Sequence, residues 1–299
     1  FLFIFAKIFI MIWFILSVLT AFLTSVKSVF IKKSVSAKNI DEYVVAWVSA
    51  LFAVPFSLAV LFAIGLPDIY KMFWPALVIG GTLTVVWLVL MAKAIKYSDL
   101  SLAMPLLAFS PLFVVATAPF IVKEIPNLFG LVGVSLIVLG AYTLNIQERR
   151  KGFLAPFKIL FKEKGAVLML IVAFIGGLSG SFDKMGIVNS SAIFWVFASN
   201  AFAAATLFIL LMLRKNNHLK QFSSNLSILI LIGIIAGISQ ISQMTATGLT
   251  LVAYVVAVKR TSIVISVLLG WLIFKEKNIR ERLMGALIML AGVLFIVFS

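Results

Sequence analysis

The sequence has no cysteine and only one histidine, His218. The absence of cysteine excludes disulfides, thiolate nucleophiles and cysteine-containing zinc sites, and a single histidine leaves no pair for a metal site or a proton relay. The chain also lacks the Walker A pattern G-x-x-x-x-G-K-[ST], so it has no phosphate-binding loop for ATP. We therefore expect no enzyme activity, no cofactor and no metal ion.

Charged residues are also scarce. They make up 12% of the 299 residues, whereas 63% are hydrophobic and the mean hydropathy is +1.20. Soluble domains carry about 25% charged residues, so this chain has too little polar surface for a water-facing globule. Ten acidic residues stand against 25 basic ones, and in so apolar a chain this excess is typical of cytoplasmic loops rather than of nucleic-acid binding. The sequence predicts a multi-pass protein of the lipid bilayer, in the plasma or inner membrane, without a nucleic-acid partner.

Apolar runs recur along the whole chain. A helix needs about 20 mostly apolar residues to cross a bilayer, and the runs end at charged or turn-forming clusters. We expect ten spans, at 8–30, 43–65, 72–92, 100–122, 127–146, 165–186, 192–213, 225–248, 251–274 and 283–298. Runs such as 226–238 are apolar on every side, whereas membrane barrel strands alternate apolar and polar residues. The predicted fold class is an all-α membrane protein.

The two halves of the chain resemble each other. A Lys-Glu pair and two glycines recur at a constant offset of 152 residues: Lys123, Glu124, Gly133 and Gly140 correspond to Lys275, Glu276, Gly285 and Gly292. Small residues also recur in membrane helices simply because they allow close packing, but this does not explain the charged pair. An odd number of spans in each half reverses the second half in the membrane. We expect two inverted five-helix repeats, 1–146 and 165–299, joined by a basic linker, 147–164; such repeats are typical of secondary transporters.

The basic residues are unevenly distributed between the two sides of this arrangement. Most lie in the odd-numbered loops and in the linker, whereas the other side holds four: Lys7, Lys71, Lys123 and Lys184. The positive-inside rule therefore predicts that the odd-numbered loops and the linker are cytoplasmic.

Lys259 and Arg260 lie near the middle of the expected ninth span. A charge at this depth costs at least about 2.5–3.5 kcal/mol, and such residues usually face the bundle interior or a wet cavity. Asp183, near the end of the sixth span, is the one carboxylate expected inside a span, so an anionic group on a substrate is the expected partner of the two cations. The alternative is a structural arginine whose guanidinium binds carbonyl groups at a kinked helix.

Other polar and aromatic residues are candidates for the same site. They lie on the third, fourth, eighth and ninth spans: Trp87, Ser110, Ser239, Gln240, Gln243 and Tyr254. Ser110 precedes Pro111, where proline should bend the fourth span and free backbone carbonyls. The alternative is that the serine and glutamine side chains hold helices together and that Trp87 only packs. Asp183 and Lys259 are also the candidates for proton coupling.

The stretch 253–262, continued by 269–277 and by the helix with Gly285 and Gly292, resembles the EamA domain of the drug/metabolite transporter superfamily. The segment from Met104-Pro105-Leu106-Leu107 to Lys123-Glu124 and Gly140 resembles a first copy, so the resemblance covers essentially the whole chain. It implies a secondary transporter with a central cavity between the halves. Members export amino acids or metabolites, or exchange nucleotide sugars and sugar phosphates. Lys259-Arg260 is also similar to the Lys-Arg pair with which plastid phosphate translocators hold phosphate, although their additional lysine has no counterpart here.

We expect a secondary transporter, monomeric or homodimeric, that moves a small polar or anionic metabolite by alternating access. An amino acid or another carboxylate is the expected substrate, with Lys259 and Arg260 as its main contacts. An exchanger of phosphorylated metabolites or nucleotide-sugar-like anions is the first alternative. A non-transporting membrane scaffold is the second, but it leaves the two central cations unexplained.

Overall fold

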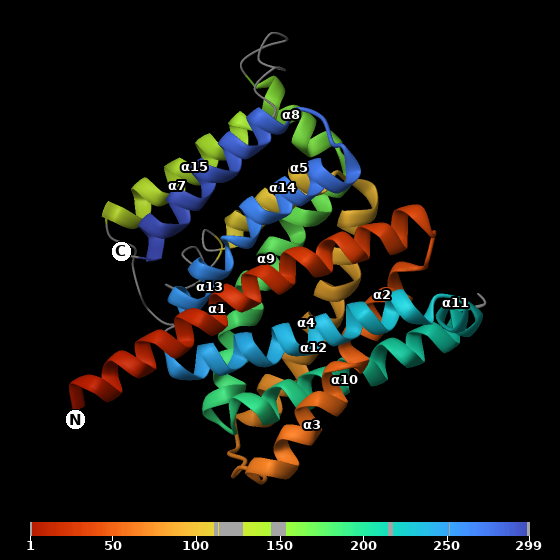
Figure 1. Ribbon diagram of the computed structural model, residues 1–299, viewed down its shortest axis with the longest axis vertical. Coiled ribbons are helices and arrows are strands. Elements are labelled where there is room, and N and C mark those ends of the chain that lie inside the picture. Colours follow the sequence, from red (N-terminus) through yellow and green to blue (C-terminus); the bar gives the residue numbers. More distant parts are fainter. Residues whose placement is uncertain are drawn as a thin grey trace. The chain divides into compact units, whose positions relative to one another are not determined.

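The computed structural model describes residues 2–110, 113, 128–144, 154–214, 218–250 and 252–297, and within these ranges it contains helices and no strand (Figure 1). The elements follow one another as α1 (Leu2–Lys32), the π-helix η1 (Lys33–Ala37), α2 (Glu42–Leu51), α3 (Ala53–Ile64), α4 (Phe73–Tyr97), α5 (Leu100–Ala103), the 3-10 helix η2 (Met104–Phe109), α7 (Leu128–Thr143), α8 (Ala155–Lys162), α9 (Lys164–Val188), α10 (Ala192–Leu213), α11 (His218–Ser224), α12 (Leu226–Leu249), α13 (Val252–Lys259), α14 (Ser262–Phe274) and α15 (Ile279–Val297). The expectation of an all-helical fold is confirmed.

Six helical segments are long and apolar enough to cross a membrane. They are Ile12–Ala37, Glu42–Ile64, Phe73–Tyr97, Lys164–Val188, Ala192–Leu213 and Leu226–Leu249. These correspond to the expected first to third and sixth to eighth spans, and they confirm a multi-pass membrane protein. The count of ten spans stays a prediction.

Local capping sets where several of these helices begin. The side chain of Asp41 accepts a hydrogen bond from the backbone N–H of Tyr43 at 2.8 Å at the start of α2. Ser191 accepts one from Phe194 N–H at 3.2 Å at the start of α10. Each cap satisfies a backbone donor that has no partner within its own helix, and the two polar residues therefore separate successive apolar runs.

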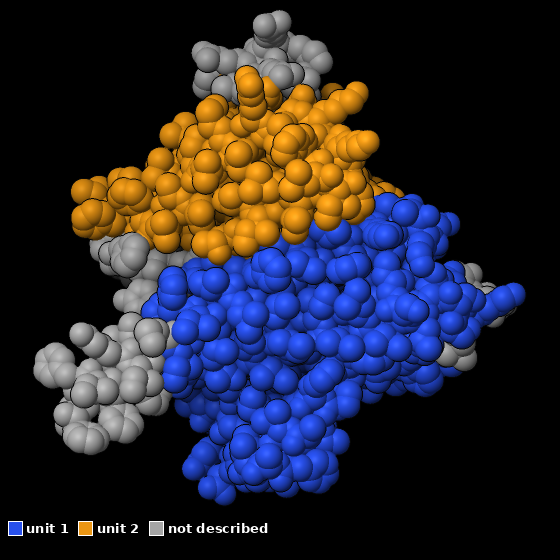
Figure 2. Space-filling view, viewed as in Figure 1, with its two compact units in different colours: residues 1–92, 179–259 blue, residues 93–178, 260–299 orange. Residues whose placement is uncertain are grey.

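The chain forms two compact units (Figure 2). Unit 1 comprises residues 1–92 and 179–259, and unit 2 comprises 93–178 and 260–299. The boundaries between the units fall inside α4 and α9 and directly after α13. Each unit therefore takes helices from both halves of the sequence. The predicted boundaries at 146 and 165 describe the sequence repeat, and they stay a prediction.

Unit 1 is organised around α12, which packs along α1 and against α2, α3 and α10. Its largest buried side chain is Trp195 on α10, with none of its surface exposed. The indole packs at right angles to Phe73, with ring centroids 5.9 Å apart. A Cβ atom on Gly186 of α9 would overlap this ring, so glycine is needed where α9 passes the indole. The result is a rigidly held tryptophan beside the end of α9.

In unit 2, α7 and α15 pack side by side along their length (Figure 1). A Cβ atom on Gly140 would lie 2.8 Å from the carbonyl oxygen of Gly285, and one on Gly292 would lie 2.6 Å from that of Gly133. Residue numbers therefore rise along α7 while the numbers of the α15 residues that contact it fall, so the two helices are antiparallel. The four glycines that recur at the 152-residue offset are the ones that face each other, and they let the two backbones approach closely.

Candidate functional site

Lys259 is the last residue of α13, and α14 begins three residues later at Ser262. Between the two helices the backbone tightens, because the N–H of Ile263 donates to the carbonyl of Arg260, three residues earlier, at 2.9 Å. The expectation of one continuous helix over 251–274 is therefore wrong. The position 152 residues earlier lies at the end of η2, where the first half also departs from α-helical geometry. Both halves thus carry an irregular helix at corresponding positions.

The side chain of Lys259 points to α12 within unit 1. Its Nζ atom donates to Oε1 of Gln243 at 2.5 Å. It also lies within electrostatic range of the Asp183 carboxylate on α9. We call Asp183, Gln243 and Lys259 the polar cluster. One positive charge, one negative charge and one neutral amide are thus gathered from three different helices.

Asp183 is held in place by a buried donor. Its Oδ1 atom accepts a hydrogen bond from Nε1 of Trp195 at 3.0 Å, and the indole itself is fixed in the core of unit 1. The neighbouring Lys184 has a different role. Its Nζ donates to the carbonyl oxygens of Thr247 at 2.7 Å and Thr250 at 3.3 Å, so it caps the C-terminal end of α12. Two adjacent charges on α9 therefore serve separate purposes.

A pair of amides links α12, which carries Gln243, to α10, which carries Trp195. Asn200 of α10 donates to Gln240 of α12 at 3.3 Å, and Gln240 donates back at 3.2 Å. The sequence pointed to Gln240 but not to Asn200, although an asparagine in the apolar run 192–213 was a visible signal. Because each amide already has both a donor and an acceptor in the other, the pair joins α10 to α12.

The remaining predicted residues are more dispersed. Ser239 accepts from Thr20 through its carbonyl at 3.5 Å, and its hydroxyl lies 3.4 Å from that of Thr24, so it joins α12 to α1. Trp87 packs against an apolar cluster of α2, α4 and α10. Tyr254 lies in α13, but its side chain is outside the described part of the chain.

Arg260 and Ser110 belong to unit 2, and both are buried. Within the described residues, Nε of Arg260 and the hydroxyl of Ser110 have no hydrogen-bond partner. The structure thus gathers three of the predicted residues into the polar cluster and places Gln240 one helical turn from Gln243. Their role in substrate binding stays a prediction.

Comparison with known proteins identifies the family. A sequence model of the EamA-like transporter family matches residues 11–146 and again residues 163–298. The chain belongs to the EamA-like transporter family. This confirms the resemblance found in the sequence, and it points to a membrane transporter of small molecules.

A solved structure titled only "Crystal structure of protein" shares the fold of this EamA-family chain, with a TM-score of 0.61 at 16% identity. The match covers 93% of this chain and 95% of the other. No curated protein matches the sequence. The comparisons thus identify the family, and they name no substrate.

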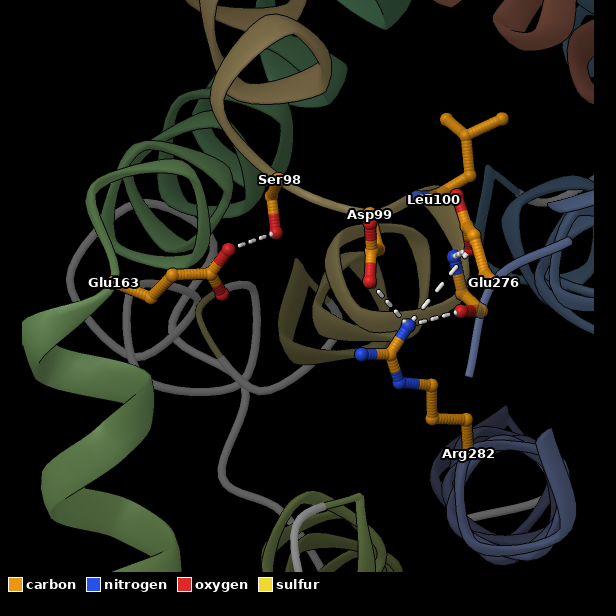
Figure 3. A network of polar contacts seen from close by, with 7 residues as sticks. Ser98, Asp99, Leu100, Glu163, Glu276 and Arg282 are labelled. Carbon is orange, nitrogen blue, oxygen red and sulfur yellow. Dashed lines mark hydrogen bonds and ion pairs between the residues drawn. The ribbon is translucent and has the colours of Figure 1, made fainter. Parts of the chain in front are cut away.

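Glu276, from the Lys-Glu pair that recurs at the 152-residue offset, has a structural role in unit 2 (Figure 3). The Glu276 carboxylate accepts two backbone hydrogen bonds at the start of α5, from Leu100 N–H and Ser101 N–H, both at 2.8 Å. Arg282 Nη1 donates to Asp99 at 2.9 Å and to the Ser101 hydroxyl at 2.5 Å, and it lies 3.8 Å from Glu276. We call these residues the α5 cap network. Glu276 is thus the N-terminal cap of a helix from the other half.

The sequence analysis missed the buried charge of Lys27. Lys27 lies within the span Ile12–Ala37 on α1 and is only 8% exposed. Its signal was the same as that of Lys259, a cation inside an apolar run. Since α1 packs against α12 and α13, Lys27 belongs to the same unit as the polar cluster.

Proposed function

We propose that this EamA-family protein transports a small zwitterionic metabolite, an amino acid, and that Lys259 and Asp183 hold its two charges. The observation that carries the proposal is the Lys259–Gln243 hydrogen bond within electrostatic range of Asp183. A substrate carboxylate pairs with Lys259, and a substrate ammonium pairs with Asp183. Gln243 is a neutral acceptor, so an ionised carboxylate can displace it from Lys259 for a stronger, charge-assisted bond.

Charge balance favours a zwitterion over a more highly charged ligand. Lys259 and Asp183 carry opposite charges, so a zwitterion leaves the polar cluster neutral. A phosphate ester brings two negative charges to one lysine and one aspartate, and uncompensated charge is expensive inside a membrane. Arg260, adjacent to Lys259 in the sequence, favours a phosphorylated metabolite as the second candidate.

Alternating access between two inverted five-helix halves is the proposed mechanism. Transporters built from such repeats bind substrate at helices that are interrupted at corresponding positions of the two halves. The junction of α13 with α14 and the 3-10 helix η2 supply such a pair of interruptions. The antiparallel crossing of α7 and α15 supports the inverted relation.

The test measures substrate-induced thermal stabilisation of the purified protein in detergent, followed by uptake into proteoliposomes. The ligands are amino acids, carboxylates without an amino group, and phosphorylated metabolites. We expect amino acids to stabilise the wild-type protein, and Lys259→Gln to weaken their binding about 10- to 100-fold, since a hydrogen bond to a charged group contributes about 1.5–3 kcal/mol. The variant should remain folded, because it removes a charge from the membrane interior.

Lys184→Gln is the matched control. It removes the same charge at the residue next to Asp183 on α9, but it breaks bonds to the backbone carbonyls of Thr247 and Thr250 at the end of α12. We expect a lower melting temperature and an unchanged ligand-induced shift. If Lys259→Gln keeps the full shift with amino acids, the polar cluster is not the binding site. If phosphorylated metabolites alone stabilise the protein, the second candidate replaces the first.

A further inference from the structure

An apolar pocket of about 600 Å³ lies within unit 2, between η2, α7, α8 and the first half of α9. All ten of its lining side chains are apolar, and they include Phe109, Phe113, Phe161 and Phe174. The Phe113 and Phe174 rings meet edge to face with centroids 5.3 Å apart. Phe161 is 66% exposed, so the lining reaches the surface of the molecule. The pocket contains none of the residues of the polar cluster or the α5 cap network.

The position of α8 places one end of this pocket at the membrane surface. The helix ends at Lys162, and the membrane span α9 begins two residues later at Lys164. Its described side chains differ in exposure around the helix. Lys158 and Lys162 are exposed and lie one turn apart, whereas Leu160, about 200° away around the helix from Lys158, is buried and lines the pocket. Phe161, the exposed residue of the lining, lies about 60° from Lys158, so it joins the pocket to the basic face. A short helix with a basic face and an apolar face is typical of the membrane interface.

The other end of the pocket lies at the depth of the hydrocarbon. Ile171 and Phe174 also line it, and at 1.5 Å per residue they lie about 10–15 Å along α9 from its first residue. The pocket therefore runs from the level of lipid headgroups into the level of lipid chains. A free metabolite or a phosphate ion matches only its basic end, whereas a lipid matches both ends.

We propose that this pocket binds an anionic phospholipid, with an acyl chain among the phenylalanines and the headgroup phosphate beside Lys158 and Lys162. The apolar lining alone does not select a lipid, because bilayer chains are as apolar as the pocket. Selectivity comes from charge, and a lysine near an anionic headgroup is worth about fivefold in affinity, so the two together give about 30-fold. Glu163, next to Lys162, keeps its negative charge, but the hydroxyl of Ser98 donates to its carboxylate at 2.7 Å and holds it at the end of α4.

The test compares phosphatidylglycerol with phosphatidylcholine of the same chains, added to the delipidated full-length protein in detergent. Native mass spectrometry counts bound lipids, and thermal melts give the apparent affinities. We expect one retained phosphatidylglycerol, a preference of about 30-fold over phosphatidylcholine, and a preference that shrinks in high salt. Glycerol phosphate and inorganic phosphate, which have no chains, should not stabilise the protein. If they stabilise it as well as the lipid does, the site is an anion site and the proposal fails.

Two variants separate the headgroup contact from the chain contact. Lys158→Gln/Lys162→Gln should reduce the preference for phosphatidylglycerol to nearly onefold, whereas Lys277→Gln, an exposed lysine in another predicted cytoplasmic loop, should leave it unchanged. Val138→Trp places an indole in the lining and should remove the retained lipid, with the melting temperature of the delipidated protein as the folding check. Equal binding of the two lipids by the wild type, or full retention by Val138→Trp, would overturn the proposal.

Discussion

Replacing Glu276 by glutamine isolates the energetic contribution of the α5 cap network. The wild-type carboxylate accepts from two backbone donors at 2.8 Å, lies 3.8 Å from Arg282, and is only 8% exposed. Glutamine keeps one acceptor oxygen but presents an NH₂ group to the second donor. One of the two bonds is therefore lost, the other becomes neutral, and a buried N–H of α5 is left without its partner.

The magnitude follows from these two bonds. A hydrogen bond to a charged group contributes about 1.5–3 kcal/mol and a neutral one about 0.5–1.5 kcal/mol, so Glu276→Gln should lower the free energy of unfolding by about 3 kcal/mol. In a chain of this size that corresponds to a fall in melting temperature of about 6–12 °C. Glu276→Ala removes both bonds and should cost more. Asp68→Asn makes the same change of charge at an exposed carboxylate and should cost less than about 0.5 kcal/mol.

Thermal melts of the detergent-purified variants, read by intrinsic fluorescence or by size-exclusion after heating, measure these differences. Asp99→Asn should combine non-additively with Glu276→Gln, because both carboxylates serve Arg282. A melting temperature for Glu276→Gln that matches the Asp68→Asn control would refute the reasoning. In that case the backbone donors at the start of α5 would have found other acceptors, and the two hydrogen bonds would not be a determinant of stability.

Two further predictions concern helix packing and the charge of the polar cluster. Gly140→Ala should destabilise the protein by about 1–3 kcal/mol, because the added Cβ would lie 2.8 Å from the backbone nitrogen of Met289. The control is Gly248→Ala, where the nearest neighbour of the added Cβ is 3.7 Å away; it should be neutral or stabilise the protein by about 0.5–1 kcal/mol in the same melts. Equal effects of the two substitutions would argue against a tight crossing of α7 and α15. Asp183→Asn keeps an acceptor for Trp195 but loses the charge, so the melting temperature should change little while amino acids lose their advantage over carboxylates without an amino group. Amino-acid binding that is unchanged in this variant would exclude Asp183 as the partner of the ammonium.

Much of the architecture could be predicted because its determinants are local. Apolar runs of about 20 residues predict membrane helices directly, and six of them are found at the expected places. The four glycines that recur at the 152-residue offset are also those at which α7 and α15 meet, although the sequence alone indicated only that such residues allow close packing. The interruption after Lys259 was not predictable in the same way. No proline or glycine marks it, and the tightened turn at Arg260 depends on the surroundings of the helix.

The polar contacts were the least predictable part. Sequence reasoning treated Glu276 as a loop residue that marks the repeat, but its backbone partners, Leu100 and Ser101, lie about 175 residues away along the chain. Asp183 is a second example. The sequence identified it as the one carboxylate expected inside a span, but it did not reveal the partner of that carboxylate. Its contact with Trp195 depends on how the end of α9 meets α10. A sequence reveals that a polar residue is buried, but its partner depends on which helices pack together.

The packing of α7 against α15 follows the 152-residue repeat, whereas the polar cluster does not. The crossing of α7 and α15 repeats its own contacts, since Gly140 and Gly285 correspond to Gly292 and Gly133 under the 152-residue offset. The polar cluster has no such counterpart. The residues 152 positions before Asp183, Gln243 and Lys259 are all apolar and buried: Ile31, Met91 and Leu107. An inverted repeat with two polar clusters would suit a ligand with equivalent ends, whereas one cluster with one acid and one base presents two different ends. That asymmetry favours a molecule whose two charged groups differ in sign, and it is the reason that a zwitterion, rather than a symmetric dianion, is the first substrate to test.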